Sequence, residues 1–159
     1  MEQEVFRPMQ KKDVNRVHEV ECTCFRSPWS KLAILGELRN DVAHYLVMEV
    51  DGVICGYGGM WVLFEEAHVT NVAVMPERRG KGCGKRLMLA MMQHAMKYGA
   101  EKMTLEVRES NTVAQNLYTS LGFLQNGFRP RYYSDTGEGA LILWNNHIKE
   151  TIDGENNKT

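Results

Sequence analysis

Apolar and polar positions in the first part of the chain change from a period of two to a period near 3.6, which predicts one strand followed by two helices. The strand covers Glu4–Met9, and apolar residues at helical spacing predict a helix over about Lys11–Cys24. The run Ser27-Pro28-Trp29-Ser30 breaks that helix. Ser30 can then cap a second helix that continues through Arg39.

The middle of the chain is rich in β-formers. His44–Val50 and Val53–Phe64 are joined by Asp51-Gly52, a dipeptide typical of a two-residue hairpin turn. A further β-branched run, His68–Met75, is ended by Pro76. We therefore expect three consecutive strands.

The last part alternates between helix and strand and ends in a polar tail. The expected elements are a helix over Gly82–Tyr98, a strand over Lys102–Arg108, a helix over Thr112–Leu121, and strands over Phe123–Phe128 and Gly139–Trp144. The order β-α-α-β-β-β-α-β-α-β-β predicts a mixed α/β (α+β) chain built on one sheet. Residues 1–146 are expected to form a single domain and 147–159 a polar tail, frayed from Glu150 onward.

Composition narrows the class of protein. The 159 residues are 43% hydrophobic and 25% charged, which is ordinary for a globular domain. The formal net charge of -1 gives no reason to expect nucleic acid or an anionic membrane as a partner. No apolar run approaches the length that crosses a bilayer, and the first residues lack the pattern of a signal peptide, so a cytoplasmic protein is expected.

The metal-binding residue types do not cluster. Of four cysteines, Cys22 and Cys24 form a C-x-C pair, while Cys55 and Cys83 stand alone, and the five histidines are scattered. Zinc sites usually show C-x2-C or paired Cys/His spacing, and the chain has no second pair. We expect free thiols and no metal.

The most informative segment lies where a strand gives way to a helix. Three alternating glycines, Gly80, Gly82 and Gly84, lie where the predicted helix begins, with basic residues between and beside them. Glycines allow a bulky anion to approach the backbone, and the first turn of a helix offers unpaired N–H groups and the positive end of its dipole. This arrangement is suited to binding a pyrophosphate.

Other nucleotide motifs fit less well. A Walker A loop requires Ser or Thr after Gly-Lys, but Lys85 is followed by Arg86. A Rossmann fingerprint requires a different glycine spacing and follows the first strand. A glycine-rich turn with a solvated basic patch remains a simpler alternative.

The segment Arg79–Gly84 matches the Q/R-x-x-G-x-G/A motif of the GNAT superfamily of acetyltransferases. The chain further resembles the ribosomal-protein alanine N-acetyltransferase group of that superfamily. Matching segments follow one another over roughly Phe25–Leu143: Phe25 with Pro28-Trp29-Ser30, Asn71-Val72-Ala73-Val74, Leu105-Glu106-Val107-Arg108, Ser110-Asn111, Leu117-Tyr118, Leu121-Gly122-Phe123 and Tyr132-Tyr133. The resemblance implies a GNAT-like domain with a central, mostly antiparallel sheet flanked by helices, and acetyl-CoA as co-substrate.

The resemblance also implies residue roles. Glu106 would be the general base, acting directly or through water, and Tyr118 the general acid towards the CoA sulfur. The residues implied in acetyl-CoA binding are Val72, Ala73 and Val74 for the pantetheine arm and acetyl carbonyl, Arg79, Gly80, Lys81, Gly82, Cys83, Gly84 and Lys85 for the pyrophosphate, and Asn111 from the next helix.

These roles are chemically consistent with the transfer of an acetyl group to an amine. About a tenth of an α-amine with a pKa of about 7.7–8.0 is already neutral at pH 7, so a carboxylate gives sufficient help. A strand amide near Val74 can stabilise the oxyanion, and a phenol can protonate the departing thiolate. The pattern alone leaves simpler alternatives open: Glu106 on a solvated strand face, Tyr118 packed in the core and Asn111 as a helix cap.

Loops are expected to select the acceptor. Trp29, Tyr132 and Tyr133 are candidate substrate-binding residues, and Glu65 and Glu66 could attract a cationic peptide. The chain departs from its group in two places. Glu138-Gly139 stands where many members have an acidic pair, and Cys83 replaces an aliphatic residue.

Three functions remain. The favoured one is acetylation of the N-terminal α-amine of a protein, with a ribosomal protein as the type substrate. The second is acetylation of a small amine such as a polyamine, an amino acid or an aminoglycoside. The third is a module that binds acetyl-CoA without turnover, which would need neither Glu106 nor Tyr118. The sequence does not indicate an oligomeric state.

Overall fold

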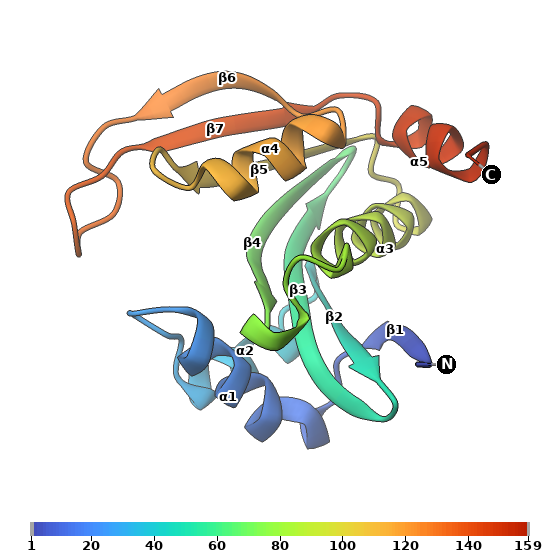
Figure 1. Cartoon of the computed structure of the whole chain (residues 1–159), viewed down its shortest axis with the longest axis vertical. Coiled ribbons are helices and arrows are strands. Elements are labelled where there is room, and N and C mark those ends of the chain that lie inside the picture. Colours follow the sequence, from blue (N-terminus) through green and yellow to red (C-terminus); the bar gives the residue numbers. More distant parts are fainter. Residues whose placement is uncertain (1, 159) are drawn as a thin grey trace. The chain divides into compact units, whose positions relative to one another are not determined.

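The computed structural model describes residues 2–158, so Met1 of the expected domain and Thr159 of the expected tail lie outside the described residues. The predicted succession of strands and helices is present, with one further helix near the C-terminus (Figure 1). The strands are β1 (Glu4–Pro8), β2 (Ala43–Val50), β3 (Val53–Leu63), β4 (Glu66–Val74), β5 (Lys102–Arg108), β6 (Leu124–Arg129) and β7 (Ala140–Asn145). The helices are α1 (Val14–Cys24), α2 (Lys31–Leu38), α3 (Cys83–Lys97), α4 (Thr112–Ser120) and α5 (Ile148–Asn156), with short 3-10 helices η1 (Lys11–Asp13) and η2 (Pro76–Arg78).

The strands hydrogen-bond in the order β1-β2-β3-β4-β5-β7-β6. Strand β4 runs parallel to β5, whereas the pairs β1–β2, β2–β3, β5–β7 and β6–β7 are antiparallel. The predicted mixed α/β fold with a mostly antiparallel sheet and flanking helices is therefore confirmed.

The chain forms two compact units that share β3, β4 and α3. The first unit runs to Trp61 and resumes over Thr70–Met91, and the second comprises Val62–Val69 and the chain from Met92 onward. The end of β4 and the start of α3 thus belong to the first unit, and β5 to α5 belong to the second.

The predicted hairpin is present in the first unit. Asp51 and Gly52 both have positive φ angles, 51° and 82°, and they join the paired residues Val50 and Val53. Two positive φ angles define the type I′ turn, whose twist matches that of the flanking strands. The turn fixes the register of β2 on β3.

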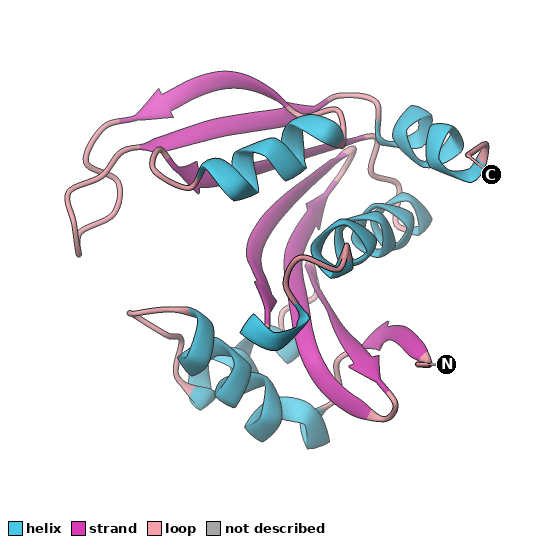
Figure 2. Cartoon of the chain, viewed as in Figure 1, coloured by secondary structure: helices cyan, strands magenta, loops and turns pink. Residues whose placement is uncertain are grey.

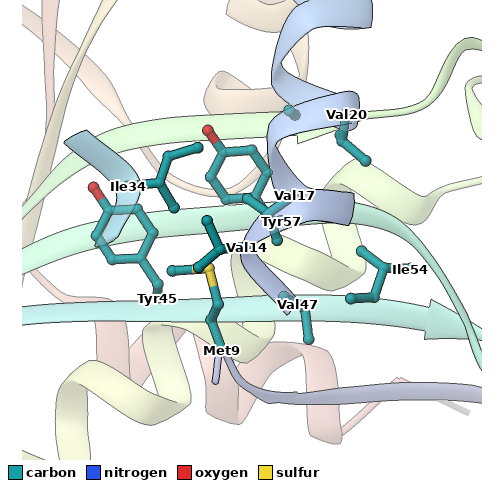
Figure 3. Close-up of a cluster of buried hydrophobic side chains, with 10 residues drawn as sticks. Met9, Val14, Val17, Val20, Ile34, Tyr45, Val47, Ile54 and Tyr57 are labelled. Carbon is teal, nitrogen blue, oxygen red and sulfur yellow. The ribbon is translucent and has the colours of Figure 1, made fainter. Parts of the chain in front are cut away.

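The core of the first unit forms between α1 and the strands β2 and β3. Val14, Val17 and Val20 recur at helical spacing and are buried against β2 and β3, which contribute Val47 and Ile54 (Figure 3). The helical spacing of these valines in the sequence predicted this apolar face.

One carboxylate interrupts this apolar helix face. Glu21 is only 2% exposed, and it accepts hydrogen bonds from the Tyr57 hydroxyl and from the Trp29 backbone N–H, the latter at 2.9 Å. A buried carboxylate requires such donors, because burial without them is strongly unfavourable. Glu21 thus ties the segment between α1 and α2 to β3.

The second unit contains the other edge of the sheet. Glu66–His68 of β4 pair in parallel with Lys102–Thr104 of β5, and β7 pairs with β5 on one side and with β6 on the other. The pairs Glu106–Ile142 and Arg108–Ala140 fix the register of β5 on β7.

The expectation of a frayed C-terminal tail is wrong. Residues Ile148–Asn156 form α5, which Figure 2 draws as a helix. Ile148 and Ile152, four residues apart, are 0% and 6% exposed, and the Asn145 side-chain amide donates to the Thr151 hydroxyl at 2.9 Å. Burial of these two apolar residues, together with this side-chain hydrogen bond, docks the short polar helix against the rest of the second unit.

Candidate active site

The strand-to-helix turn has the backbone that its glycines predict. Strand β4 ends at Val74, η2 follows, and α3 begins at Cys83. Gly80 and Gly82 have φ angles of 77° and 80°, in the region that only glycine adopts without strain. The path of the loop therefore depends on these two glycines.

The loop presents backbone N–H groups at a helix start. The first helical hydrogen bond runs from the Arg86 N–H to the Gly82 carbonyl at 3.1 Å. The N–H groups of Gly82 to Lys85 precede it and have no intrahelical acceptor. Together with the positive end of the helix dipole, they favour an anion.

The space at Gly80 is consistent with a bulky ligand. A Cβ built on Gly80 would meet no atom within 4 Å, so nothing in the protein fills that side of the loop. A Cβ on Gly82 would lie 2.7 Å from the Arg86 guanidinium. The loop therefore fits the pyrophosphate of acetyl-CoA, which needs open space and backbone donors.

Two of the basic side chains near the loop, Arg79 and Arg86, are hydrogen-bonded to other parts of the protein, whereas Lys81 is exposed. Arg79 donates from Nε to the Val74 carbonyl at 3.0 Å, so it fastens the loop to the end of β4. Arg86 donates to both carboxylate oxygens of Glu4, at 2.6 and 2.9 Å, and to the Lys81 carbonyl at 3.0 Å. Lys81 itself is exposed. Arg86 was not among the predicted site residues, and its role in holding the loop comes from its contact with Glu4, which is distant in sequence.

The side chain of Cys83 faces the interior. It is 4% exposed and packs with Met48, Val50 and Cys55. Only its backbone N–H is therefore suited to a ligand at the start of α3. The thiol therefore occupies a core position, which is consistent with the aliphatic residue that the resembled group has there.

In the second unit, Glu106 lies on the less buried face of β5. Its neighbours Leu105 and Val107 are buried, whereas the Glu106 side chain is 32% exposed. The predicted alternation along this strand is thus present. The carboxylate is accessible, as a general base requires.

A guanidinium accompanies this carboxylate. Arg129 of β6 places its Nε 3.9 Å from a Glu106 carboxylate oxygen. Arg129 pairs with Ala140 of β7, which also pairs with Arg108 of β5, so Arg129, Arg108 and Glu106 share one face of the sheet.

A β-bulge in β6 produces this arrangement. Asn126 and Gly127 together lie opposite the single residue Ile142, between the pairs Gln125–Leu143 and Phe128–Leu141. One extra residue moves every later side chain of the strand to the opposite face. Gly127 has a φ of 156° and its hypothetical Cβ would lie 3.1 Å from Ile142 Cδ1. The bulge therefore turns Arg129 towards Glu106.

Tyr118 of α4 is buried, with 8% of its surface exposed, and its ring meets Phe123 edge-on at 5.7 Å. Burial raises the pKa of the Tyr118 phenol to about 12, and Tyr133 adds to that rise. The two alternatives for this residue are thus compatible: the ring packs in the core while the hydroxyl stays protonated and can donate a proton.

The candidate substrate tyrosines lie in the same unit. The Tyr132 and Tyr133 rings meet edge-on at 5.0 Å, and the Arg108 guanidinium lies 4.0 Å from the centre of the Tyr133 ring. Burial raises the pKa of Tyr133, and the Arg108 cation offsets part of this. Arg108 was not among the predicted site residues, although its spacing of two from Glu106 places both on one strand face.

Asn111 and Trp29, two of the predicted binding residues, both make hydrogen bonds that stabilise the local fold. The Asn111 side-chain oxygen accepts from the Ala114 N–H at 3.1 Å, so Asn111 is the N-cap of α4. Trp29, in the first unit, is partly buried and its backbone N–H is bound by Glu21.

The departure at Glu138-Gly139 has a physical explanation. Glu138 accepts from the Ser110 N–H at 3.0 Å and from Arg108 at 3.3 Å, and these contacts lower its pKa. A side chain at Gly139 would collide with the Phe128 ring, whose nearest carbon would be 2.2 Å from the Cβ. Glu138 is thus engaged in holding its own loop, and a side chain at position 139 would require the exposed Phe128 ring to move.

Residues 2–158 contain neither a cluster of metal-binding side chains nor a membrane-spanning helix. No group of three or more His, Cys, Asp or Glu side chains is placed to hold a metal ion in this range. Within the same residues, none of the helices is both long and apolar enough to cross a membrane.

The fold, the glycine loop before α3 and the motif residues define an acetyltransferase of the GNAT type. The family model described as acetyltransferase (GNAT) family matches residues 14–123, and the chain belongs to this family.

Its similarity extends to individual relatives. It is 42% identical over 139 residues to a putative [ribosomal protein bS18]-alanine N-acetyltransferase of Bacillus subtilis, covering 87% of this chain and 92% of the relative. It is 37% identical to the [ribosomal protein bS18]-alanine N-acetyltransferase of Haemophilus ducreyi, over 83% of this chain and 92% of the relative. The crystal structure of the ribosomal-protein-S18-alanine N-acetyltransferase from Escherichia coli superposes with a TM-score of 0.83 at 26% identity, covering 89% of this chain and 92% of that one.

Proposed function

We propose that this protein transfers the acetyl group of acetyl-CoA to the N-terminal α-amine of a protein, with an alanine-starting ribosomal protein as its type substrate. The relatives named above act, by their names, on the alanine of ribosomal protein bS18. The observation that carries the proposal is the presence, within one unit, of an accessible carboxylate, Glu106, and a buried protonated phenol, Tyr118.

The two side chains suit the two proton transfers of the reaction. Glu106 accepts a proton from the attacking amine, directly or through water, as the nitrogen bonds to the acetyl carbon. Tyr118 donates its proton to the sulfur as the carbon–sulfur bond breaks. The products are then an N-acetyl amide and free CoA, and no covalent intermediate with the protein is needed.

The glycine loop would hold the co-substrate. Backbone N–H groups from Gly80 to Lys85 would bind the pyrophosphate, and the exposed Lys81 would add a favourable charge. Acetyl-CoA supplies the activated thioester on which the amine acts. Asn111 and the Val72–Val74 backbone are the remaining proposed contacts.

The proposed substrate carries consequences for partner and compartment. A protein N-terminus is the acceptor, and ribosomal proteins are made in the cytoplasm, so we place the enzyme there. Cell fractionation that recovered the protein outside the cytoplasm would contradict this assignment.

The function is tested by measuring thiol release from acetyl-CoA with short Ala- and Ser-starting peptides, alongside polyamines and free amino acids. We expect turnover with the peptides, abolished when their α-amine is blocked. Turnover with small amines alone would move the assignment to a small-amine acetyltransferase. CoA binding without turnover on any acceptor would indicate a binding module.

The role of Glu106 is tested by Glu106→Gln, which keeps the shape and removes the base. We expect kcat/KM for the peptide to fall about 100-fold, because general-base catalysis contributes at least that much. The matched control is Glu101→Gln, which removes an exposed carboxylate just before the same strand. Equal activity of both variants would exclude Glu106 as the base.

A further inference from the structure

We infer that Arg108 is a positioning residue for the acceptor: it holds the segment Tyr133–Glu138, and with it the Tyr133 side chain, in the arrangement that binds the peptide. The inference rests on the proposed function and deepens it, since it names the residue that shapes the acceptor side of the site.

Arg108 makes contacts spread over the whole segment. Its Nη2 donates to Asp135 at 2.9 Å, and its Nη1 donates to Thr136 and Glu138 at 3.2 and 3.3 Å. Its guanidinium plane also lies 4.0 Å from the centre of the Tyr133 ring. A planar guanidinium can satisfy several acceptors and stack on an aromatic ring at once, which a lysine ammonium cannot.

The segment itself is a narrow surface loop. The Tyr133 N–H donates to the Glu138 carbonyl at 3.0 Å, and the Gly137 N–H donates to the Tyr133 carbonyl at 2.8 Å. Gly137 has a φ of 78°, and Arg131 just before the loop has a φ of 51°, which is strained for a residue with a side chain. A short exposed loop with strained entry needs an anchor to keep one conformation.

The charges around Arg108 make the anchor necessary. Arg108 lowers the pKa of Asp135, and the Ser110 N–H with Arg108 lowers that of Glu138, so both are ionised near neutral pH. Without the guanidinium, the carboxylates of Asp135 and Glu138 would lose a cation that both of them contact. Like charges repel, and the loop would open.

The link to the acceptor passes through Tyr133. The Tyr133 ring lies 4.0 Å from the Arg108 guanidinium, and Arg108 shares one face of β5 with Glu106, two residues before it. Tyr133 is therefore held beside the strand face that carries the proposed base. A shift of the loop would change the surface that meets the amine and leave the glycine loop of the first unit unchanged.

The first test is hydrogen exchange, followed by mass spectrometry, on wild type and Arg108→Gln. We expect exchange in residues 132–139 to become at least about tenfold faster, because the variant loses a charge-assisted anchor. Exchange in the hairpin at Asp51-Gly52 should stay unchanged. Lys149→Gln, which removes an exposed cation of α5, is the control and should leave residues 132–139 at the wild-type rate. Unchanged exchange in Arg108→Gln would overturn the inference, whether or not the wild type acetylates peptides.

Kinetics then separate positioning from general damage. We expect KM for an Ala-starting peptide to rise about tenfold in Arg108→Gln, with KM for acetyl-CoA unchanged, and a smaller rise in Arg108→Lys. Combining Arg108→Gln with Tyr133→Ala should raise the peptide KM no further than the larger single effect. Additive effects, or an equal rise in both KM values, would overturn the inference. A wild type inactive on every peptide would instead refute the proposed function, and the exchange result would still decide whether Arg108 holds the loop.

Discussion

Glu106 and Tyr118 have opposite surroundings, and the difference matches their proposed tasks. The Glu106 carboxylate is partly exposed beside Arg129, so it can pass a proton on to solvent. The Tyr118 phenol is buried, and burial keeps it protonated. A base must pass its proton on to solvent, whereas an acid must stay protonated until the sulfur leaves. The different exposure of the two side chains suits these two roles.

The pKa of Tyr118 leads to a prediction about pH. Because it is raised to about 12, the phenol stays protonated well beyond the pKa of the peptide amine. We expect kcat/KM of the wild type to rise as the amine deprotonates, around pH 7.7–8.0, and to show no decline from Tyr118 up to pH 10. Tyr118→Phe should lower kcat about 100-fold.

The control for this prediction is Tyr98→Phe, which removes an exposed phenol from the end of α3. Thiol-release rates of the three proteins across pH 6 to 10 provide the measurement. A descending limb near pH 9 that persists in Tyr98→Phe and disappears in Tyr118→Phe would show that Tyr118 ionises too early to be the acid as described.

Single residues show where sequence reasoning succeeds. Alternation along β5 predicted that Leu105 and Val107 face the core and left Glu106 on the other face, and this is confirmed. Arg108 lies on the same face by the same rule, but its partners Asp135 and Glu138 are distant in sequence. Nothing local indicates that a loop nearly thirty residues later folds back onto it.

At the scale of elements, the glycine loop is the feature most open to a direct test. Gly80 and Gly52 have nearly equal φ angles, 77° and 82°, and a Cβ on either would meet no atom within 4 Å. An alanine at either position therefore carries the same strain, about 1–2 kcal/mol. Only the Gly80 Cβ would point into the space proposed for the pyrophosphate.

We therefore predict that Gly80→Ala and Gly52→Ala lower Tm by similar amounts, but that only Gly80→Ala weakens CoA binding, by about tenfold or more. Calorimetric titration with CoA measures the dissociation constant directly. Equal affinity in both variants would place the pyrophosphate elsewhere.

Most elements could be predicted from local signals, because each has its own boundary residue. Ser30 caps α2 by accepting from the Ala33 N–H, as predicted, and Asp51-Gly52 turns the hairpin. Helix α5 lacked such a signal: Ile148 and Ile152 are two apolar residues in a polar stretch, and their burial depends on tertiary docking. The bulge at Asn126-Gly127 was equally hidden, since it shows only in the pairing of β6 with β7.

At the scale of the whole molecule, paired carboxylates are distributed over both units. Arg86 lowers the pKa of Glu4, and Arg7 lowers that of Asp13, in the first unit. Arg108 does the same for Asp135 in the second. Because the pKa of each group is lower in the folded state, each favours folding above its ordinary pKa, and this stabilisation is lost as the pH falls through the folded-state value.

We predict that Tm stays nearly constant from about pH 7 to 5 and falls below about pH 4.5, where these carboxylates become protonated. Arg7→Met should lower Tm at pH 7, since Arg7 donates to Asp13 at 2.8 and 2.9 Å, and the difference from wild type should shrink towards pH 3. Thermal unfolding followed by circular dichroism is the measurement. A difference that stays constant with pH would mean that Arg7 contributes through packing and not through charge.

The bulge in β6 makes the face that Arg129 occupies a matter of counting. Because Asn126 and Gly127 share one place opposite Ile142, the strand holds one residue more than regular alternation needs. Deleting Asn126 would leave Gly127 alone opposite Ile142, so Phe128 and Arg129 would keep their partners Leu141 and Ala140 and their present faces. If the same residues instead paired without a bulge, Phe128 would lie on the Glu106 face and Arg129 on the other. The bulge is thus a spare place in the strand, and deletion of one of its two residues should be tolerated better than deletion of a single residue from β7 opposite.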